Sequence, residues 1–108
     1  VMESPEFCIV LTTTSSEEQA DKLAKMIIER DLGACVQIQS IKSYYKWEGD
    51  LCTDPEWLLI IKTMTSCYGD LEAAIASNHT YTTPEILQVP IQAGSSDYLT
   101  WLKFSVKP

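Results

Sequence analysis

The chain begins with two segments whose apolar spacing differs, one typical of a strand and one of a helix. An apolar run from Phe7 to Leu11 predicts a first strand. The next apolar positions recur three and four residues apart, which predicts an amphipathic helix: Ala20, Leu23, Ala24, Ile27 and Ile28. Ser15, followed three residues later by Glu18, predicts the capping box that starts this helix. Gly33 is expected to end it as a C-terminal glycine.

Residues 34–47 predict a long second strand in which the apolar pattern changes phase. The apolar positions fall on two opposite alternations: Val36 and Ile38 on the first, and Ile41, Tyr45 and Trp47 on the second. A phase change within one strand indicates either a β-bulge or a switch in which face of the strand is covered. Turn-forming residues follow at 47–50, and the connection is either short or runs on to Pro55.

The segment from Trp57 to Ile61 is apolar at every position, which is typical of a strand covered on both faces. Alternation of polar and apolar residues extends this predicted strand through residues 62–65. A second helix fits residues 67–78, and residues 86–91 predict a fourth strand. Pro90 places that strand at a sheet edge or bulge, because proline cannot donate a backbone hydrogen bond.

The last residues predict a third helix that begins after Ser95 and carries its larger side chains on one stripe: Tyr98, Trp101, Leu102 and Ser105. The predicted order is therefore strand, helix, strand, strand, helix, strand, helix. Its first six elements form the split βαβ arrangement of ferredoxin-like α+β folds, an antiparallel sheet with helices on one face. No linker or repeat interrupts the pattern, so we expect residues 1–108 to form a single domain.

The strand at residues 57–61, which is apolar at every position, has a consequence for how the chain is expected to associate. A ferredoxin-like sheet has helices on one face only, so its strands should alternate apolar and polar residues, yet residues 57–61 do not. Tyr44, Tyr45 and Trp47 add further apolar surface to the neighbouring strand. The final helix could cover part of the second face. Further copies of the chain are the better cover, and burying a few hundred Å² at about 25 cal/mol per Å² favours such association.

Composition and net charge limit the classes of molecule that the chain is expected to bind. Hydrophobic residues make up 45% of the 108, as in globular proteins, and the net charge is −7. Such an acidic chain is not expected to bind nucleic acid or anionic membranes. Residues 1–7 lack the basic and apolar regions of a signal peptide, and the four cysteines form no CxxC motif. We therefore expect a reducing, cytoplasmic location.

Several segments resemble, in the same order, the motifs of the CutA divalent-cation-tolerance family. The matching segments are Gly33-Ala34-Cys35, Ser43-Tyr44-Tyr45-Lys46-Trp47-Glu48-Gly49, Ile61-Lys62-Thr63, Asn78-His79-Thr80-Tyr81-Thr82-Thr83-Pro84-Glu85-Ile86 and Tyr98-Leu99-Thr100-Trp101. The resemblance implies a ferredoxin-like homotrimer whose long hairpin strands pair between subunits. It also implies a role in tolerance of, or response to, divalent metal ions, copper especially, with no catalytic activity.

Metal binding is expected to be weak. For family members that bind copper, the resemblance implies three ligands: a cysteine near the end of the first strand and two adjacent histidines after the second helix. The corresponding residues here are Thr12, Asn78 and His79, so only His79, the single histidine, retains a ligand type. We expect it to be exposed. No cofactor is required; copper or another divalent cation would bind through copies of His79 around a symmetry axis, or with a nearby sulfur ligand.

The candidate sulfur ligands are Cys35, Cys67 and Met64. We expect Cys35 to be buried in the core, and Cys67, at a helix start, to be the more reactive thiol. Residues that could line a ligand cleft or a subunit interface are Tyr45, Trp47, Lys62, Tyr81, Glu85 and Trp101. Lys62 is expected to snorkel or pair with a carboxylate, Glu85 among them, rather than to hold an anionic ligand.

A second functional hypothesis is a trimeric signalling scaffold that binds a small ligand or an unidentified protein in clefts between subunits, without a metal role. Trimeric ferredoxin-like proteins that bind nucleotides are the analogy, which rests on fold alone. The motifs of common hydrolases, P-loops and dinucleotide-binding folds are absent from the sequence. We therefore expect no enzymatic activity.

Overall fold

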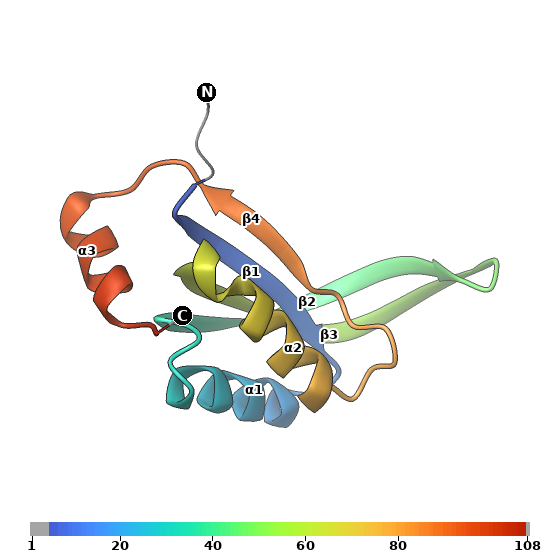
Figure 1. Ribbon diagram of the computed structural model, residues 1–108. Coiled ribbons are helices and arrows are strands. Elements are labelled where there is room, and N and C mark those ends of the chain that lie inside the picture. The colour runs from blue at the N-terminus through green and yellow to red at the C-terminus, as the bar shows by residue number, and fades with distance from the viewer. Residues whose placement is uncertain (1–4, 108) are drawn as a thin grey trace.

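Four strands form one antiparallel sheet in the computed structural model, which describes residues 5–107 (Figure 1). The elements follow the chain as β1 (Phe7–Thr14), α1 (Glu17–Glu29), β2 (Cys35–Trp47), β3 (Asp50–Met64), a 3₁₀ turn (Thr65–Cys67), α2 (Tyr68–Asn78), β4 (Leu87–Ile91) and α3 (Ser96–Phe104). The strand order is β2-β3-β1-β4. This order confirms the ferredoxin-like α+β fold predicted from the sequence.

The expectation about a signal segment concerned residues 1–7, most of which lie outside the described residues. Within residues 5–107, no helix has the length and apolar character needed to cross a bilayer.

The main core lies between the sheet and the two helices α1 and α2. Even-numbered residues of β1 and odd-numbered residues of β3 point to this side, because successive strand residues alternate between faces. They meet the apolar stripes of both helices, and the following side chains are at most 1% exposed: Cys8, Val10, Leu23, Ile27, Leu59, Ile61, Leu71 and Ile75. Burying each large side chain contributes about 1.5–3 kcal/mol.

The ends of α1 differ from the sequence prediction by one residue at the start and two at the stop. The N-cap is Ser16, whose side chain accepts a hydrogen bond from the Gln19 N–H at 3.1 Å, and not Ser15. After the helix, Asp31 adopts the left-handed backbone conformation at φ 58° that we expected of Gly33. Gly33 is needed for space: a Cβ there would lie 2.7 Å from Ile27 Cγ2.

β2 and β3 pair without interruption from Cys35 opposite Lys62 to Trp47 opposite Asp50. Of the two alternatives offered for the phase change in β2, the β-bulge is therefore wrong and the switch of covered face is confirmed. Val36 packs against the helix-side core, whereas Tyr45 and Trp47 point to the other face. The connection is the short one, with Glu48 and Gly49 at positive φ as a two-residue hairpin turn requires.

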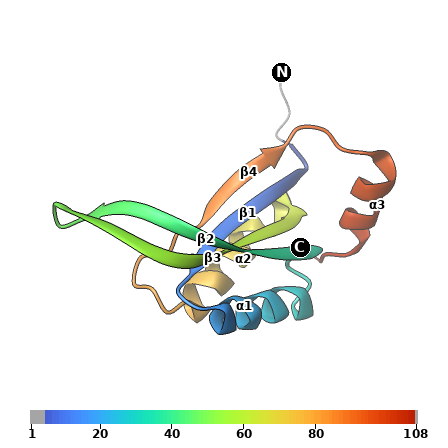
Figure 2. The ribbon, with the colours of Figure 1, turned by 180° about the vertical axis from the view of Figure 1, so that it is seen from behind.

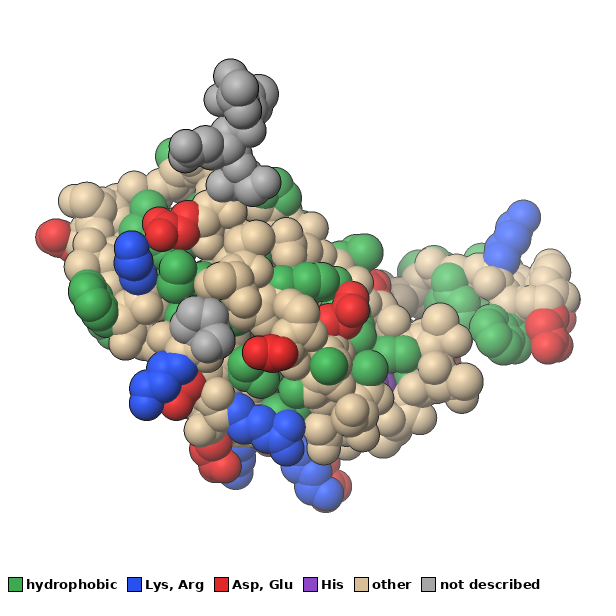
Figure 3. All heavy atoms as spheres, viewed as in Figure 1, with side chains coloured by type: hydrophobic (Ala, Val, Ile, Leu, Met, Phe, Trp, Pro, Cys, Tyr) green, Lys and Arg blue, Asp and Glu red, His purple; other side chains and the backbone are tan. Residues whose placement is uncertain are grey.

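β1 stops pairing with β3 at Trp57, so the remainder of the hairpin leaves the sheet as a two-stranded ribbon. We call this ribbon, residues 41–56, the arm; it projects from the body in Figures 1 and 2. Figure 3 shows hydrophobic side chains on it beside charged ones, and its most exposed large hydrophobic residues are Tyr44 (66%), Trp47 (64%) and Leu51 (75%). Most residues of the arm are exposed.

The sheet face opposite α1 and α2, seen in Figure 2, has no layer of helices over it. We call it the open face. It presents apolar residues from three adjacent strands: Ile9, Leu11, Leu58, Ile60, Leu87 and Val89. α3 lies at one end of the sheet, where Leu102 and Val106 pack with Met64 and Cys67. The final helix therefore covers only that end of the open face.

Two cysteines lie differently from expectation, and Lys62 has neutral partners. Cys35 is half-buried and pairs in the sheet opposite Lys62, instead of lying in the core. Cys67 is fully buried, which is unfavourable for the reactive thiol that we predicted. Cys8 is also buried, and burial raises the pKa of its thiol. Lys62 donates to Gln37 Oε1 at 2.6 Å and lies 5.8 Å from the centroid of the Tyr98 ring, and within residues 5–107 it forms no ion pair with a carboxylate.

Candidate functional site

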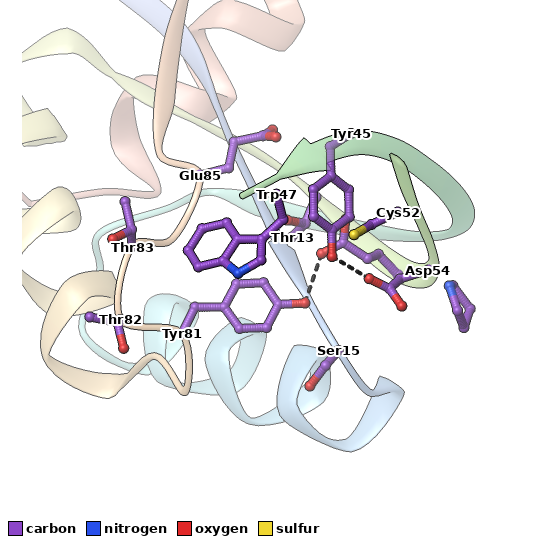
Figure 4. Close-up of a pocket in the computed structure, with 12 residues that line it drawn as sticks. Thr13, Ser15, Tyr45, Trp47, Cys52, Asp54, Tyr81, Thr82, Thr83 and Glu85 are labelled. Atoms are coloured by element: carbon purple, nitrogen blue, oxygen red, sulfur yellow. Dashed lines mark hydrogen bonds between the residues drawn. The ribbon is translucent and has the colours of Figure 1, made fainter. Parts of the chain in front are cut away.

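A cavity of about 950 Å³ opens on the open face where the arm leaves the sheet (Figure 4). Its residues come from β1 (Thr13), from β2 (Tyr45, Trp47), from β3 (Cys52, Asp54, Glu56) and from the segment between α2 and β4 (Tyr81, Thr82, Thr83, Glu85). The strand residues share one face because they alternate along each strand and pair across it, as Tyr45 does with Cys52. We call this cavity the arm-base pocket.

Aromatic rings form one wall of the arm-base pocket. Figure 4 shows Tyr45, Trp47 and Tyr81 pointing toward one another, with the two strand residues on the arm and Tyr81 on the facing segment. The arm-base pocket thus joins residues far apart in the sequence. Aromatic walls with a few placed polar groups are typical of small-molecule sites.

Each of the two tyrosines donates its phenolic O–H to a carboxylate of β3. Tyr81 donates to Glu56 Oε2 at 2.7 Å, and Tyr45 donates to Asp54 Oδ2. The hydrogen bond to Asp54 raises the pKa of Tyr45 to about 12, because the neutral phenol is the form that donates. Burial, followed by the hydrogen bond to Glu56, raises the pKa of Tyr81 as well. Both phenols therefore stay protonated at neutral pH.

The arm-base pocket is acidic. Asp54, Glu56 and Glu85 line it, and none of the described residues lining it is a lysine, arginine or histidine. The ion pairs found within residues 5–107 lie elsewhere, between Lys103 and Glu6 and between Lys107 and Asp31. The carboxylates of the arm-base pocket have phenols as partners, or no partner, but no cation from the described part of this chain.

His79 fixes the segment that faces the arm. Its Nε2 lies 2.8 Å from the carbonyl oxygen of Thr13, and its Nδ1 accepts the Tyr81 N–H at 3.0 Å. A carbonyl only accepts and an N–H only donates, so these contacts require the neutral ring with its proton on Nε2. The His79 ring also packs against the Tyr81 ring, with the two ring centroids 4.8 Å apart and the two planes tilted by 46°. His79 is half-buried, not exposed as expected, and it positions Tyr81.

The described residues of one chain do not form a metal centre. Within residues 5–107, no group of three His, Cys, Asp or Glu side chains is close enough to hold an ion. Both His79 nitrogens already have hydrogen-bond partners, so a metal would have to displace one. Thr12 is fully buried on the helix side, and its hydroxyl finds no hydrogen-bond partner among residues 5–107. The donor set of a single chain therefore does not fit a tight copper site.

The structure brings together four of the six residues singled out for a cleft: Tyr45, Trp47, Tyr81 and Glu85. The other two, Lys62 and Trp101, do not line the arm-base pocket. Sequence reasoning missed Asp54 and Glu56. Their spacing of two in a strand, on the same face as Cys52, was the available signal.

The chain is similar to known proteins over most of its length. Residues 8–105 match the model of the family described as CutA1 divalent ion tolerance protein. A Thermus thermophilus protein named divalent-cation tolerance protein CutA is 42% identical over 96 residues, which are 88% of this chain and 93% of the relative. An Arabidopsis thaliana protein named CutA, chloroplastic, is 43% identical over 92% of this chain, which spans 55% of that relative.

Solved structures agree with the sequence relatives. The structure of CutA1 from Oryza sativa has a TM-score of 0.92 and 41% identity, covering 96% of both chains. A structure from Archaeoglobus fulgidus, named as a periplasmic divalent cation tolerance protein CutA, has a TM-score of 0.91 and 34% identity over 94% of this chain and 99% of that one. With sequence, fold and motif order all in agreement, this chain belongs to the CutA1 divalent ion tolerance family.

Proposed function

We propose that this chain serves divalent-cation tolerance as a homotrimer, without an enzymatic reaction of its own. Membership of a family described by ion tolerance, and a Thermus thermophilus relative with the same description, support the role. The open face is the observation that carries the assembly. Leu87 and Val89 are 52% and 42% exposed on it, beside apolar residues of β1 and β3.

The open face and the arm both favour association with copies of the same chain. A two-stranded ribbon is marginally stable alone, and its edges present unpaired backbone groups. Covering about 300 Å² of apolar surface per chain contributes roughly 7 kcal/mol before the costs of association. Pairing the arm with neighbouring subunits would satisfy the backbone groups and cover the exposed aromatic residues together.

Sedimentation at low micromolar concentration tests the assembly. We expect the mass of three chains of 12.1 kDa. Trp47→Ala and Leu51→Ala on the arm should shift the trimer toward monomer on dilution. Ile28→Ala is the control, because Ile28 is 43% exposed but lies on α1, away from the open face. A monomeric parent protein, or equal dissociation in the control, would contradict the proposal.

Growth on graded copper tests the role itself. A bacterial strain that lacks its own CutA gene is complemented with this chain, and we expect tolerance to return. The monomeric arm variants should restore less tolerance than Ile28→Ala at matched protein levels. Equal growth with the parent chain and an empty vector would count against the proposed role.

Copper or another divalent cation is proposed to bind weakly, and only in the assembled protein. Support comes from His79, the single histidine of the sequence, because a trimer would contain three copies of it. Binding must either displace the Tyr81 N–H from Nδ1 or break the hydrogen bond that Nε2 donates to the Thr13 carbonyl, so the affinity should be low. Calorimetry with copper and zinc should show weak binding that His79→Ala abolishes. A cytoplasmic location stays a prediction, and the names of two relatives specify a chloroplast and a periplasm.

A further inference from the structure

The arm-base pocket holds negative charge that its own chain does not balance. Asp54, Glu56 and Glu85 line it, and none of the described residues lining it is a lysine, arginine or histidine. The pocket opens on the face that the proposed trimer covers, so these carboxylates lose water when the subunits meet. Removing a carboxylate from water is costly unless a cation or several hydrogen-bond donors replace the water. The surface that covers the pocket is therefore expected to bring a positive charge.

Seven of the eight lysines and arginines in the sequence are poorly placed to supply this charge. Three lie on α1, on the other side of the sheet: Lys22, Lys25 and Arg30. Two already form ion pairs within the chain: Lys103 and Lys107. Two are even-numbered residues of β2 and point away from the side that carries Tyr45 and Trp47: Lys42 and Lys46. Only Lys62 remains.

Lys62 lies on the open face and has neutral partners. Even-numbered residues of β3 share one side of the strand, so Lys62 is on the same side as Asp54 and Glu56. Its Nζ lies 2.6 Å from Gln37 Oε1 and 5.8 Å from the centroid of the Tyr98 ring, and within residues 5–107 no carboxylate pairs with it. An ammonium group that loses water at a subunit contact needs an anion, just as the carboxylates need a cation.

Lys62 cannot reach the arm-base pocket of its own chain. Six residues separate it from Glu56 along β3, which is about 20 Å and far more than the length of a lysine side chain. Figure 2 shows the arm and α3, whose Tyr98 lies beside Lys62, at opposite ends of the sheet. The subunits of a cyclic trimer meet head to tail, so that one end of a chain contacts the other end of the next. Opposite charges at the two ends of one face suit this arrangement.

Glu85 is the carboxylate of the arm-base pocket best placed to accept a cation. Asp54 and Glu56 each accept a phenolic O–H, whereas Glu85 has no such partner among residues 5–107 and is exposed in one chain. Figure 4 shows it entering from the segment that leads to β4, on the same side as the rings of Trp47 and Tyr81. The faces of tryptophan and tyrosine also attract an ammonium group.

We propose that Lys62 of each chain enters the arm-base pocket of the next chain in the trimer and forms an ion pair there with Glu85, against the rings of Trp47 and Tyr81. The inference rests on the homotrimer proposed above, and it names the charge that completes each pocket. The ligand of the arm-base pocket is therefore a side chain of a second copy of this protein.

The pairing accounts for the two predicted cleft residues that do not line the arm-base pocket of their own chain, Lys62 and Trp101. Trp101 is 49% exposed and packs against Tyr98 with ring centroids 5.4 Å apart, and Tyr98 lies beside Lys62. α3 therefore accompanies Lys62 to the contact, where Trp101 adds apolar cover. The six predicted residues then meet at one subunit contact, two from one chain and four from the next.

Charge reversal tests the pairing, in a urea concentration at which the parent trimer begins to dissociate on dilution. Lys62→Glu and Glu85→Lys should each raise the protein concentration of half-dissociation about tenfold or more, because like charges then meet at every contact. The double variant exchanges the two charges and should recover most of the parent's affinity. Lys22→Glu and Glu29→Lys on α1 make the same changes in net charge away from the open face and should have no effect.

Sedimentation of these variants separates the pairing from the trimer itself. A monomeric parent would overturn both proposals. If the parent is trimeric, single reversals that dissociate no more readily than the α1 controls would overturn the pairing alone. A double variant that recovers nothing would do the same, since the two charges would then act at separate contacts.

Carbodiimide crosslinking of the parent protein provides a second test that needs no variant to fold. The reagent joins a lysine to a carboxylate in contact with it through an amide bond. Mass spectrometry of the species with the mass of two or three chains should find Lys62 joined to Glu85. Lys62 joined instead to a carboxylate outside the arm-base pocket, or left unmodified while other crosslinks form between chains, would overturn the pairing.

Discussion

The two halves of β3 share one strand and one unbroken register with β2, yet they lie in different environments. The half from Trp57 to Met64 pairs with β1 and lies under α1, so Leu59 and Ile61 are fully buried. The half from Asp50 to Glu56 pairs only with β2, and Leu51 is 75% exposed. Backbone pairing therefore extends well beyond the core, and side-chain burial distinguishes the packed half of the strand from the exposed half on the arm.

Removing a leucine from each half should give the largest contrast. Leu59→Ala should lower the free energy of unfolding by about 2–5 kcal/mol at every protein concentration, because a cavity opens in the core. Leu51→Ala should cost about 0.5 kcal/mol or less within one chain. Any further loss for Leu51→Ala should disappear on dilution. Urea unfolding at two protein concentrations measures both, and equal losses would break the distinction between the two halves.

Glycine substitutions should probe the packed half next. An added Cβ at Gly33 would lie 2.7 Å from Ile27 Cγ2 and 2.9 Å from Ile61 Cγ2. Gly33→Ala should therefore destabilise by about 1–3 kcal/mol through overpacking. Gly69 in α2 is the control, since a Cβ added there would meet nothing within 4 Å. Gly69→Ala should stabilise by about 0.5 kcal/mol, because alanine favours helix. Thermal unfolding should move in opposite directions for the two variants.

Two buried threonines on the helix side should respond oppositely to the same change. Thr12 Oγ1 has no hydrogen-bond partner in the described part of the chain, whereas Thr63 Oγ1 donates to the Leu32 carbonyl at 2.7 Å. Thr12→Val should raise stability by about 1 kcal/mol, and Thr63→Val should lower it by about as much. Urea midpoints that shift in the same direction for both would contradict the assignment of an unsatisfied hydroxyl at Thr12.

The smallest effect concerns ionisation on the arm. The Asp54 carboxylate raises the pKa of Tyr45 to about 12, so folding favours the protonated phenol. Its contribution to stability is complete below the unfolded value near 10 and is lost as pH rises through about 12. Ultraviolet titration of tyrosinate should lose a component near pH 12 in Tyr45→Phe. An unchanged titration curve would show that Asp54 does not hold this phenol.

The strands and helices were predictable because their signals are local. The unbroken apolar run at residues 57–61 located the central strand, and Pro90 correctly placed β4 at an edge. Helix ends were less certain, since Ser15 and Ser16 are both good caps and only the geometry selects Ser16. The positive φ at Asp31 was also missed, because the close approach of Ile27 and Ile61 requires glycine two residues later.

The arm-base pocket was predictable only in part. Tyr45, Trp47, Tyr81 and Glu85 were found because they belong to recognisable motifs. Asp54 and Glu56 were missed, because their role depends on the register of β3 with β2 and on the facing segment. The hydrogen bonds of His79 to Thr13 and Tyr81 were equally invisible, since they join β1 to residues after α2. Contacts across such sequence distances leave no local pattern.

The unbroken register of the arm has a consequence for how its length can change. Because every residue of β2 from Cys35 to Trp47 has a partner in β3, a single inserted residue would turn all side chains beyond it to the opposite face. Only additions of two residues to each strand keep Tyr45 and Trp47 on their present side. Each such addition lengthens the arm by about 7 Å. The length of the hairpin can therefore change only in steps of two residues per strand if the aromatic side chains are to stay on the same face.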